Sequence, residues 1–204
     1  MKKVSDNWQS AFPAGKVGPQ FWAAFEENAK NASTEIFKVK TAAEAKEIVT
    51  NLAKFTNAKK VVAVNSAMQE AANINEELKA LGIAVYNDKF DIAEHAESAD
   101  IGISTVEFAI GESGSLCMDG FSYEARVVTM LPPIHIAFMN ANNIVPGISE
   151  AFEVISKVYD DGYVSFITGP SRTADIERVL TIGVHGPSRL ILIAVDEDIN
   201  GGVK

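Results

Sequence analysis

Apolar residues in the first part of the chain recur at the spacing of an α-helix. Over residues 19–32, three aromatic side chains share one helical face. A second helix is expected to begin at Thr41, because Glu44 follows three residues later, as in a capping box, and the apolar positions after it keep a period of 3.6. The pattern therefore predicts a helical segment over residues 1–57.

The period changes after this segment. Residues 61–64 form a short continuous apolar run, which is typical of a strand covered on both faces. Residues 68–81 fit a helix ended by Gly82, and residues 83–86 fit the next strand, which predicts a parallel β-α-β unit with a right-handed crossover. The same pattern predicts further helices at 149–159 and 173–182, and further strands at 101–105, 108–111, 115–118, 127–131, 134–138, 163–168 and 190–195.

The alternation of strands and helices indicates a single α/β domain over residues 1–204, with its core at 58–204. Hydrophobic residues make up 47% of the chain, which is enough apolar material for a large core. The strands between 101 and 138 follow one another through short turns, so part of the sheet is expected to be antiparallel. We predict a three-layer α/β/α sandwich with a mixed sheet.

The excess of acidic residues in the chain makes one class of partner unexpected. The chain has 27 acidic and 18 basic residues, and residues 91–204 hold 17 of the acidic ones. Such a surface repels phosphate backbones, so nucleic acid is not expected as a partner. No apolar run follows the N-terminus as in a secretory signal, and none has the length of a membrane span, so the expected location is the cytoplasm.

The cysteine and histidine content argues against bound metal. Cys117 is the only cysteine, so it cannot form an internal disulfide, and an iron–sulfur cluster needs about four thiolates. We expect Cys117 to be a small buried apolar residue. His95, His135 and His185 are scattered without metal-ligand spacing. Neither a metal nor a bound cofactor is predicted, and His135 is expected to be structural.

Three glycine-containing turns could carry chemistry. The first is Gly111-Glu112-Ser113-Gly114-Ser115, a hairpin pattern that presents one carboxylate and two hydroxyls. Glu112 could be a nucleophile, a general base or a partner for a ligand hydroxyl, with Ser113 and Gly114 beside the ligand. The alternative is that Glu112 is a solvated turn residue.

The second turn runs from an apolar strand through Gly169-Pro170-Ser171-Arg172-Thr173 into the helix expected at 173–182. Free N–H groups at a helix start favour an anion, and Arg172 adds a planar donor suited to carboxylate or phosphate. The alternative is that Ser171 or Thr173 is only a helix cap. The glycine spacing and the lysine of a phosphate-binding Walker loop are absent from this segment.

The third turn places His185 between glycines, where the backbone can approach a ligand closely. The imidazole could serve as an acid, a base or a hydrogen-bond donor near neutral pH. The alternative is a histidine bonded to a neighbouring carbonyl group. We hypothesise that the fold brings all three turns to one cleft, in which Arg172 anchors a negatively charged ligand.

Together these segments resemble the LUD-domain family, and most closely its lactate utilisation protein C branch, whose small members lack an iron–sulfur module. The resemblance spans about residues 100–195, and the string at 167–177 is its most specific part. At Glu107, Gly111 and Ser113 the family tends to have Asp, Ala and Thr, and these differences keep the chemical type of each residue. The matching segments are 104–116, 131–137, 144–146, 167–177 and 183–187.

The resemblance implies a fold similar to that of NagB/RpiA/CoA transferase-like proteins, some of which place a catalytic glutamate on a turn like that of Glu112. It also implies a bacterial protein that takes part in oxidation of L-lactate to pyruvate beside iron–sulfur partner subunits. One hypothesis is an accessory component that binds a small anion such as lactate, pyruvate or a phosphate-bearing compound. A second is a stand-alone enzyme of the CoA-transferase or sugar-phosphate-isomerase type that uses Glu112, with His185 as a second catalytic group and the turn at 169–173 holding phosphate or CoA. A third is a binding scaffold with no catalytic role.

Overall fold

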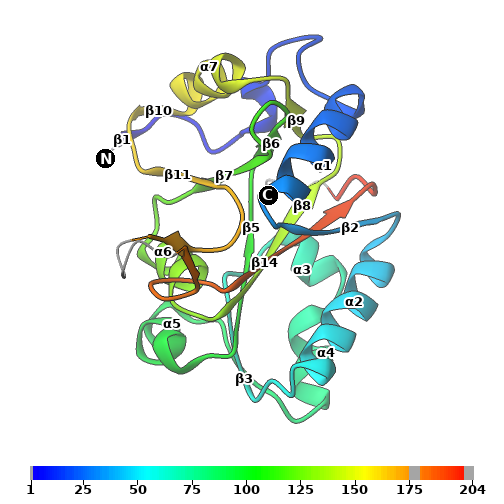
Figure 1. The fold of residues 1–204 in the computed structure, drawn as a ribbon, viewed down its shortest axis with the longest axis vertical. Coiled ribbons are helices and arrows are strands. Elements are labelled where there is room, and N and C mark those ends of the chain that lie inside the picture. Colours follow the sequence, from blue (N-terminus) through cyan, green and yellow to red (C-terminus); the bar gives the residue numbers. More distant parts are fainter. Residues whose placement is uncertain (1, 175–179, 200–204) are drawn as a thin grey trace.

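In the computed structural model, which describes residues 2–174 and 180–199, the centre of the protein is a sheet of six strands. All six run parallel, in the order β2-β14-β8-β5-β3-β4 (Figure 1). The last strand in the chain, β14, therefore lies inside the sheet between two much earlier strands. The bounds are β2 (Glu35–Val39), β3 (Lys60–Ala63), β4 (Ala84–Tyr86), β5 (Ile101–Thr105), β8 (Ile134–Asn140) and β14 (Arg189–Val195).

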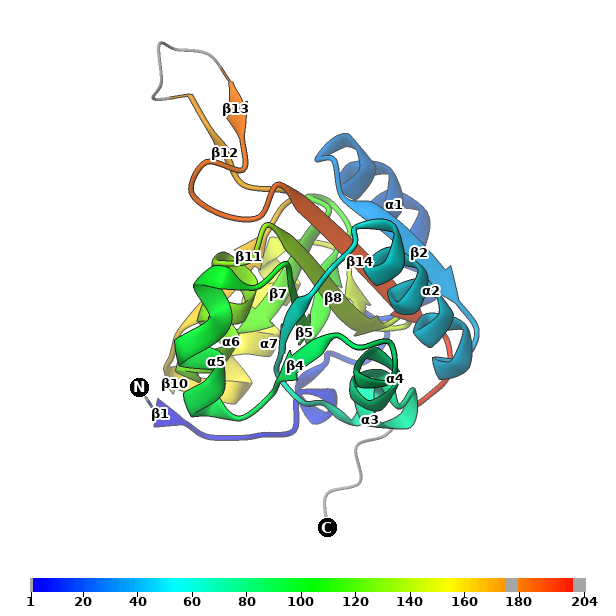
Figure 2. The ribbon, with the colours of Figure 1, turned by 90° about the horizontal axis from the view of Figure 1, so that it is seen from below.

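Both faces of this sheet are covered, which explains the continuous apolar runs of its strands. Along β14, Ile191 and Ile193 pack into one core, and Leu190 and Leu192 pack into another. Three helices cover the first face: α2 (Ala42–Phe55), α3 (Ala67–Ala71) and α4 (Ile74–Ala80). Figure 2 shows these helices on one side of the sheet, with α5 and α6 on the other.

The second face carries two helices and a second sheet. Helices α5 (Lys89–His95) and α6 (Tyr123–Met130) pack over β3 through Ile92 and Val128. The second sheet has the order β11-β7-β6-β9, and its inner face packs with the central sheet and α1 (Trp22–Asn31) while its outer face packs against α7 (Ile148–Val158). Its strands are β6 (Phe108–Ile110), β7 (Ser115–Asp119), β9 (Ile144–Val145) and β11 (Val164–Ile167).

Two short strand pairs complete the fold. Near the N-terminus, β1 (Lys2–Lys3) pairs with β10 (Tyr159–Asp161). The other pair, β12 (Arg172–Thr173) with β13 (Thr181–Ile182), forms an arm that projects from the body in Figure 2. Across the described residues, no helix combines the length and the apolar character needed to cross a bilayer.

The predicted mixed α/β fold is confirmed, but the antiparallel strands form a separate second sheet rather than part of the central one. The prediction of a purely helical segment over 1–57 is wrong, because β2 lies within it and pairs with β14. The helix predicted at 68–81 is divided at Asn73, which has a φ of 53°. The helix predicted at 149–159 is confirmed as α7.

The strand predicted at 127–131 is also wrong, because these residues belong to the end of α6. The Ser122 hydroxyl caps this helix by accepting a hydrogen bond from the Ala125 N–H, at 3.1 Å. The buried residues Ala125, Val128 and Thr129 then lie on one face at helical spacing. A short apolar run before a proline pair does not by itself distinguish a strand from a buried helix end.

Candidate functional site

A cavity of about 420 Å³ opens where β8 and β14 begin, and we call it the amino-edge cavity. The second and third turns singled out in the sequence form one side of it, and α6 and β11 form the other. Its lining residues are Thr129, Met130, His135, Ser165, Phe166, Ile167, Thr168, Gly169, Pro170, Ser171, His185, Gly186, Pro187 and Leu190.

Backbone hydrogen bonds hold the second and third turns together. The Ser171 N–H donates to the Pro187 carbonyl at 2.8 Å, and the Gly183 N–H donates to the Ser171 carbonyl at 2.9 Å. Ser171 and His185, which lie fourteen positions apart in the sequence, consequently line the same cavity. The structure thus brings together two of the three turns that the sequence indicated.

Gly169 fixes the path of the second turn. Its φ is +75°, a region that other residues rarely adopt, and a Cβ at this position would lie 1.9 Å from the carbonyl oxygen of Ala32. The turn therefore rests directly on the chain that follows α1. This contact sets where Ser171 enters the cavity wall, so Gly169 acts through backbone placement.

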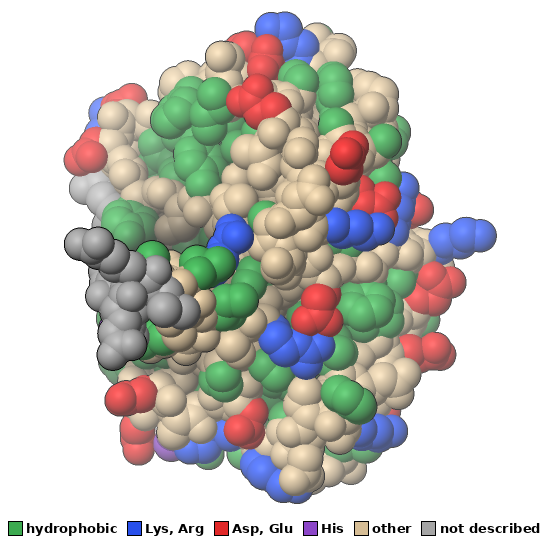
Figure 3. Space-filling model, viewed as in Figure 1, with side chains coloured by type: hydrophobic (Ala, Val, Ile, Leu, Met, Phe, Trp, Pro, Cys, Tyr) green, Lys and Arg blue, Asp and Glu red, His purple; other side chains and the backbone are tan. Residues whose placement is uncertain are grey.

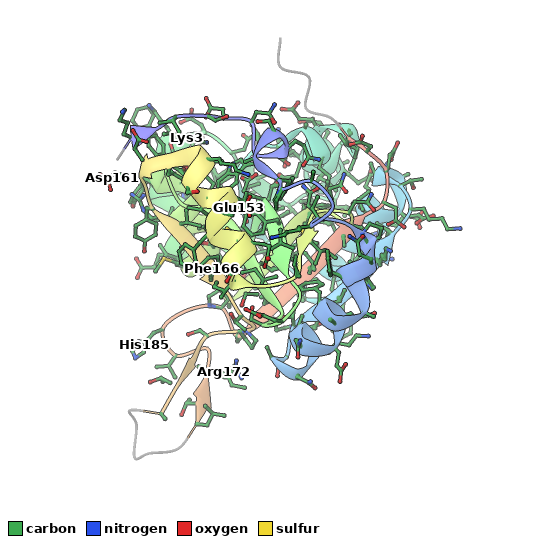
Figure 4. The ribbon with its side chains drawn as sticks, turned by 90° about the horizontal axis from the view of Figure 1, so that it is seen from above. Lys3, Glu153, Asp161, Phe166, Arg172 and His185 are labelled. Atoms are coloured by element: carbon green, nitrogen blue, oxygen red, sulfur yellow. The ribbon has the colours of Figure 1, made fainter. Side chains whose placement is uncertain are left out.

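Arg172 and Thr173 lie just outside the lining, on β12. The helix predicted at 173–182 is wrong at both of its described ends, because residues 172–173 pair with 181–182 as antiparallel strands. Residues 175–179 of that prediction lie outside the described residues. The two residues directly after Ser171 are therefore strand and not a helix start. The exposed Arg172 guanidinium donates to the Thr168 carbonyl at 3.3 Å, and Figure 4 shows Arg172 on the projecting arm and His185 on the loop next to it.

The first turn lies apart from the amino-edge cavity. Glu112 is exposed in the β6–β7 hairpin, and its Oε1 accepts a hydrogen bond from the Ile148 N–H at 2.7 Å, at the start of α7. Gly114 has a φ of +67°, and a Cβ there would lie 2.2 Å from the Ala29 nitrogen. The hypothesis of one cleft for all three turns is therefore corrected, because Glu112 is directed to a helix end.

A chain of hydroxyl groups still connects the first turn to the cavity wall. The Ser113 hydroxyl donates to the Ser115 Oγ at 2.8 Å, and the Ser115 Oγ lies 2.7 Å from the Thr168 Oγ1. Thr168 lines the amino-edge cavity. Ser113 does not line the cavity, but two successive hydrogen bonds connect it to Thr168 in the cavity wall.

Replacing Glu112 with alanine should lower the free energy of unfolding by about 1 kcal/mol, because a helix N-terminus loses both a hydrogen-bond acceptor and a negative charge. Glu112→Gln keeps an acceptor and should cost about half as much. Urea unfolding at pH 7 measures both values. Equal stability of all three proteins would contradict the assigned contact with α7.

His135 is the residue of this cavity that the sequence did not indicate as functional. It is fully buried, and its Nε2 lies 2.8 Å from the Ser104 Oγ, while its buried Nδ1 has no hydrogen-bond partner. Burial lowers the pKa of His135 to about 4, so the ring is neutral at pH 7. The signal in the sequence was a polar residue within the apolar run of β8, where a buried polar group needs a reason.

The remaining walls are apolar or carry hydroxyl groups. Phe166 lines the cavity, and its ring contacts that of Phe152 on α7 at 5.9 Å between centroids. Figure 3 shows hydrophobic side chains gathered on the surface over α7. None of the described lining residues is acidic, while hydroxyl groups come from Thr129, Ser165, Thr168 and Ser171. The cavity therefore presents hydrogen-bond donors without a repelling carboxylate.

Within residues 2–174 and 180–199, no three His, Cys, Asp or Glu side chains come together in a group that could hold a metal ion. Cys117 is fully buried in β7, and burial raises the pKa of its thiol, with the Glu107 and Asp119 carboxylates adding to the effect. Its thiolate is therefore disfavoured.

The sequence model of the LUD-domain family matches residues 22–195. The chain belongs to the LUD-domain family. The match includes the whole central sheet, both cavity-forming turns and the Glu112 hairpin. The resemblance noted in the sequence is thereby confirmed, and it extends over the earlier helical residues from α1 onward.

Curated relatives support the same assignment. The chain is 35% identical over 109 residues to "Lactate utilization protein C" of Bacillus velezensis, covering 51% of this chain and 45% of that protein. It is 30% identical over 163 residues to the protein of the same name from Halalkalibacterium halodurans, covering 66% of this chain and 71% of that one. The first match spans about half the length of the relative.

A solved structure shares the fold. A DUF162 family protein from Deinococcus radiodurans aligns with a TM-score of 0.59 and 21% sequence identity, over 90% of this chain and 99% of that one. At this identity the likeness concerns the fold alone.

Proposed function

We propose that this chain is a cytoplasmic component of a lactate-utilisation system that binds a small carboxylate, such as lactate or pyruvate, in the amino-edge cavity. The names of its relatives suggest the system. The observation that carries the ligand class is the lining of the cavity, where hydroxyl groups and the His185 ring meet without an acidic side chain among the described residues.

The geometry suits a ligand with one carboxylate and one neighbouring oxygen. Ser171 and Thr168 supply hydroxyl donors from one loop, and His185 supplies a ring nitrogen from the loop bonded to it. Arg172 adds a positive charge beside Thr168. The apolar residues Phe166 and Leu190 would face the carbon skeleton of the ligand.

Lactate or pyruvate at about 100 times its dissociation constant should stabilise the purified chain by about 2.7 kcal/mol. For a chain of this size that corresponds to a rise in melting temperature of about 5–10 °C. Ser171→Ala and His185→Ala should each weaken binding about 10- to 100-fold, since each removes a hydrogen bond to a charged ligand. Thermal shift and titration calorimetry measure these effects.

His95→Ala provides the matched control, because His95 lies on α5, contacts the Tyr86 ring and does not line the cavity. It should leave binding unchanged. Stabilisation by an acyl-CoA or a sugar phosphate, but not by lactate or pyruvate, would reject the carboxylate proposal and favour the enzyme hypothesis based on Glu112.

With a single cysteine in the chain, we propose that the electron-transfer step belongs to iron–sulfur partner subunits. The purified chain should then show no oxidation of L-lactate with an artificial electron acceptor. Turnover by the chain alone would overturn this part of the proposal while leaving the binding site intact.

A further inference from the structure

A second hollow lies at the opposite edge of the central sheet. Two cavities of about 440 and 350 Å³ share the lining residues Ser66, Thr105 and Glu107, and we call them together the carboxyl-edge cleft. They lie beyond the ends of β3, β5 and β8, at Val64, Thr105 and Asn140. In open parallel sheets this is the edge at which ligands bind.

Glu107 lies in this cleft with its backbone fixed and its side chain unused. Its N–H donates to the Cys117 carbonyl at 2.8 Å, and its carbonyl accepts from the Asn143 Nδ2 at 3.1 Å. Within the described part of the chain, its carboxyl group has no hydrogen bond or ion pair. Burial raises the pKa of Glu107 to about 8, repulsion from Asp119 adds to the rise, and Lys3 opposes it.

Thr105 offers a second unused group at the same place. Its hydroxyl oxygen is buried and has no hydrogen-bond partner. Because buried polar groups in folded proteins are nearly always hydrogen-bonded, the Thr105 hydroxyl calls for an occupant of the cleft, and the half-buried Glu107 carboxyl group lines the same space. Neighbouring amide side chains from Asn140 and Asn143 also line the cleft.

The charged side chains around the cleft indicate whether its ligand is positively or negatively charged. Among the described lining residues, Lys3 is the one basic side chain, and it already contacts Asp119 at 2.7 Å and Asp6 at 3.0 Å. Asp119 also accepts hydrogen bonds from the Phe121 N–H and the Tyr159 hydroxyl. Acidic groups remain in excess, which repels anions and attracts a positive charge.

We propose that the carboxyl-edge cleft binds a small organic cation whose primary ammonium group pairs with the Glu107 carboxylate and donates a hydrogen bond to the Thr105 hydroxyl. The binding reaction is balanced by release of one proton: protonated Glu107 gives up its proton to solvent, and the ammonium group takes its place beside the ionised carboxylate. The site is independent of the amino-edge cavity, which has no acidic lining residue among those described.

Because binding releases the Glu107 proton, the affinity for the ammonium ligand should depend on pH. Binding requires ionised Glu107, so the affinity for an ammonium ligand should rise about 50-fold from pH 6 to pH 8 and level off above it. The other groups that face Glu107 keep their charge in this range. Burial opposes ionisation of Asp119, but its hydrogen bonds outweigh burial and lower its pKa, so it stays negative. The pKa values of Lys3, Cys117 and Tyr159 are raised, so Lys3 stays positive and the other two stay neutral. Asp6 and Asp198 are the remaining carboxylates of the lining.

The test uses the full chain with ethanolamine, 1,3-diaminopropane, ethylene glycol and acetate as probes. The two amines should raise the melting temperature, and the uncharged glycol and the anion should not. Calorimetry at pH 7 in buffers of different ionisation enthalpy should show release of about 0.9 proton for each amine bound, because a carboxyl group with a pKa of about 8 is about nine-tenths protonated at that pH. This measurement needs no variant.

Variants then assign the effect to residues. Glu107→Gln should abolish both the proton release and the rise of affinity with pH, and Thr105→Val should weaken binding about tenfold while keeping the pH dependence. Glu97→Gln, at an exposed position outside the cleft, is the matched control and should behave as wild type. Binding of the glycol with an affinity that falls above pH 8, binding of acetate, or no amine binding by the wild type would each overturn the proposal.

Discussion

Replacing Gly169 with alanine should lower the free energy of unfolding by about 2–5 kcal/mol. The left-handed backbone at this residue costs an L side chain about 1–2 kcal/mol, and the crowding of a Cβ against the Ala32 carbonyl, at 1.9 Å, adds about 1–3 kcal/mol. The turn carrying Ser171 would also have to move away from α1. Urea unfolding of both proteins at pH 7 measures the difference, and ligand binding in the amino-edge cavity should weaken with it.

Gly82→Ala is the matched control for this experiment. Gly82 has a similar φ of +78°, but a Cβ there would meet no atom within 4 Å. The control should therefore show the backbone strain alone, about 1–2 kcal/mol, and should not affect binding. Equal losses in the two variants would show that the contact with Ala32 contributes nothing to the stability of the turn.

The protein should lose about 3 kcal/mol of stability between pH 7 and pH 4 through His135 alone. The folded-state pKa of this residue is lowered to about 4 by burial, whereas the unfolded chain protonates it near 6.5. The unfolded state therefore binds more protons as the pH falls, so the stabilisation is complete above pH 6.5 and is lost as the pH falls toward 4.

Comparison with His135→Gln isolates this contribution, since the carboxylates that titrate in the same range are common to both proteins. The unfolding free energy of the variant should fall less steeply with decreasing pH, by about 3 kcal/mol over the interval. Parallel curves for wild type and His135→Gln would show that the buried imidazole is not held neutral by the fold.

One hydrogen bond, between His135 and Ser104, links the wall of the amino-edge cavity to the wall of the carboxyl-edge cleft. His135 lines the amino-edge cavity, and its hydrogen-bond partner Ser104 lines the carboxyl-edge cleft. The two sites thus lie at opposite ends of one sheet and differ in charge, with hydroxyl and imidazole groups at one end and carboxyl groups at the other. The two proposed ligands, an anion at one end and a cation at the other, would therefore not compete for the same groups.

The sequence determined the class of the fold and the family. Apolar runs such as 101–105 and 190–195 predicted buried strands, and the glycines at 114 and 169 predicted tight turns, because both depend on properties of neighbouring residues. The order of the chemical segments along the chain likewise indicated the LUD-domain family, which the match over residues 22–195 confirms.

Only the tertiary structure decided which groups meet. Strand β2 exists because it pairs with β14, more than 150 residues later, and no local pattern reports such a partner. Ser171 and His185 line the same cavity, whereas Glu112 accepts a hydrogen bond from the first residue of α7. All three nevertheless lie on similar glycine-containing turns. The raised pKa of Glu107 likewise depends on its partial burial and on Asp119, which lies on β7. Backbone conformation is largely local, whereas burial, electrostatic fields and cavities arise from contacts between residues distant in the chain.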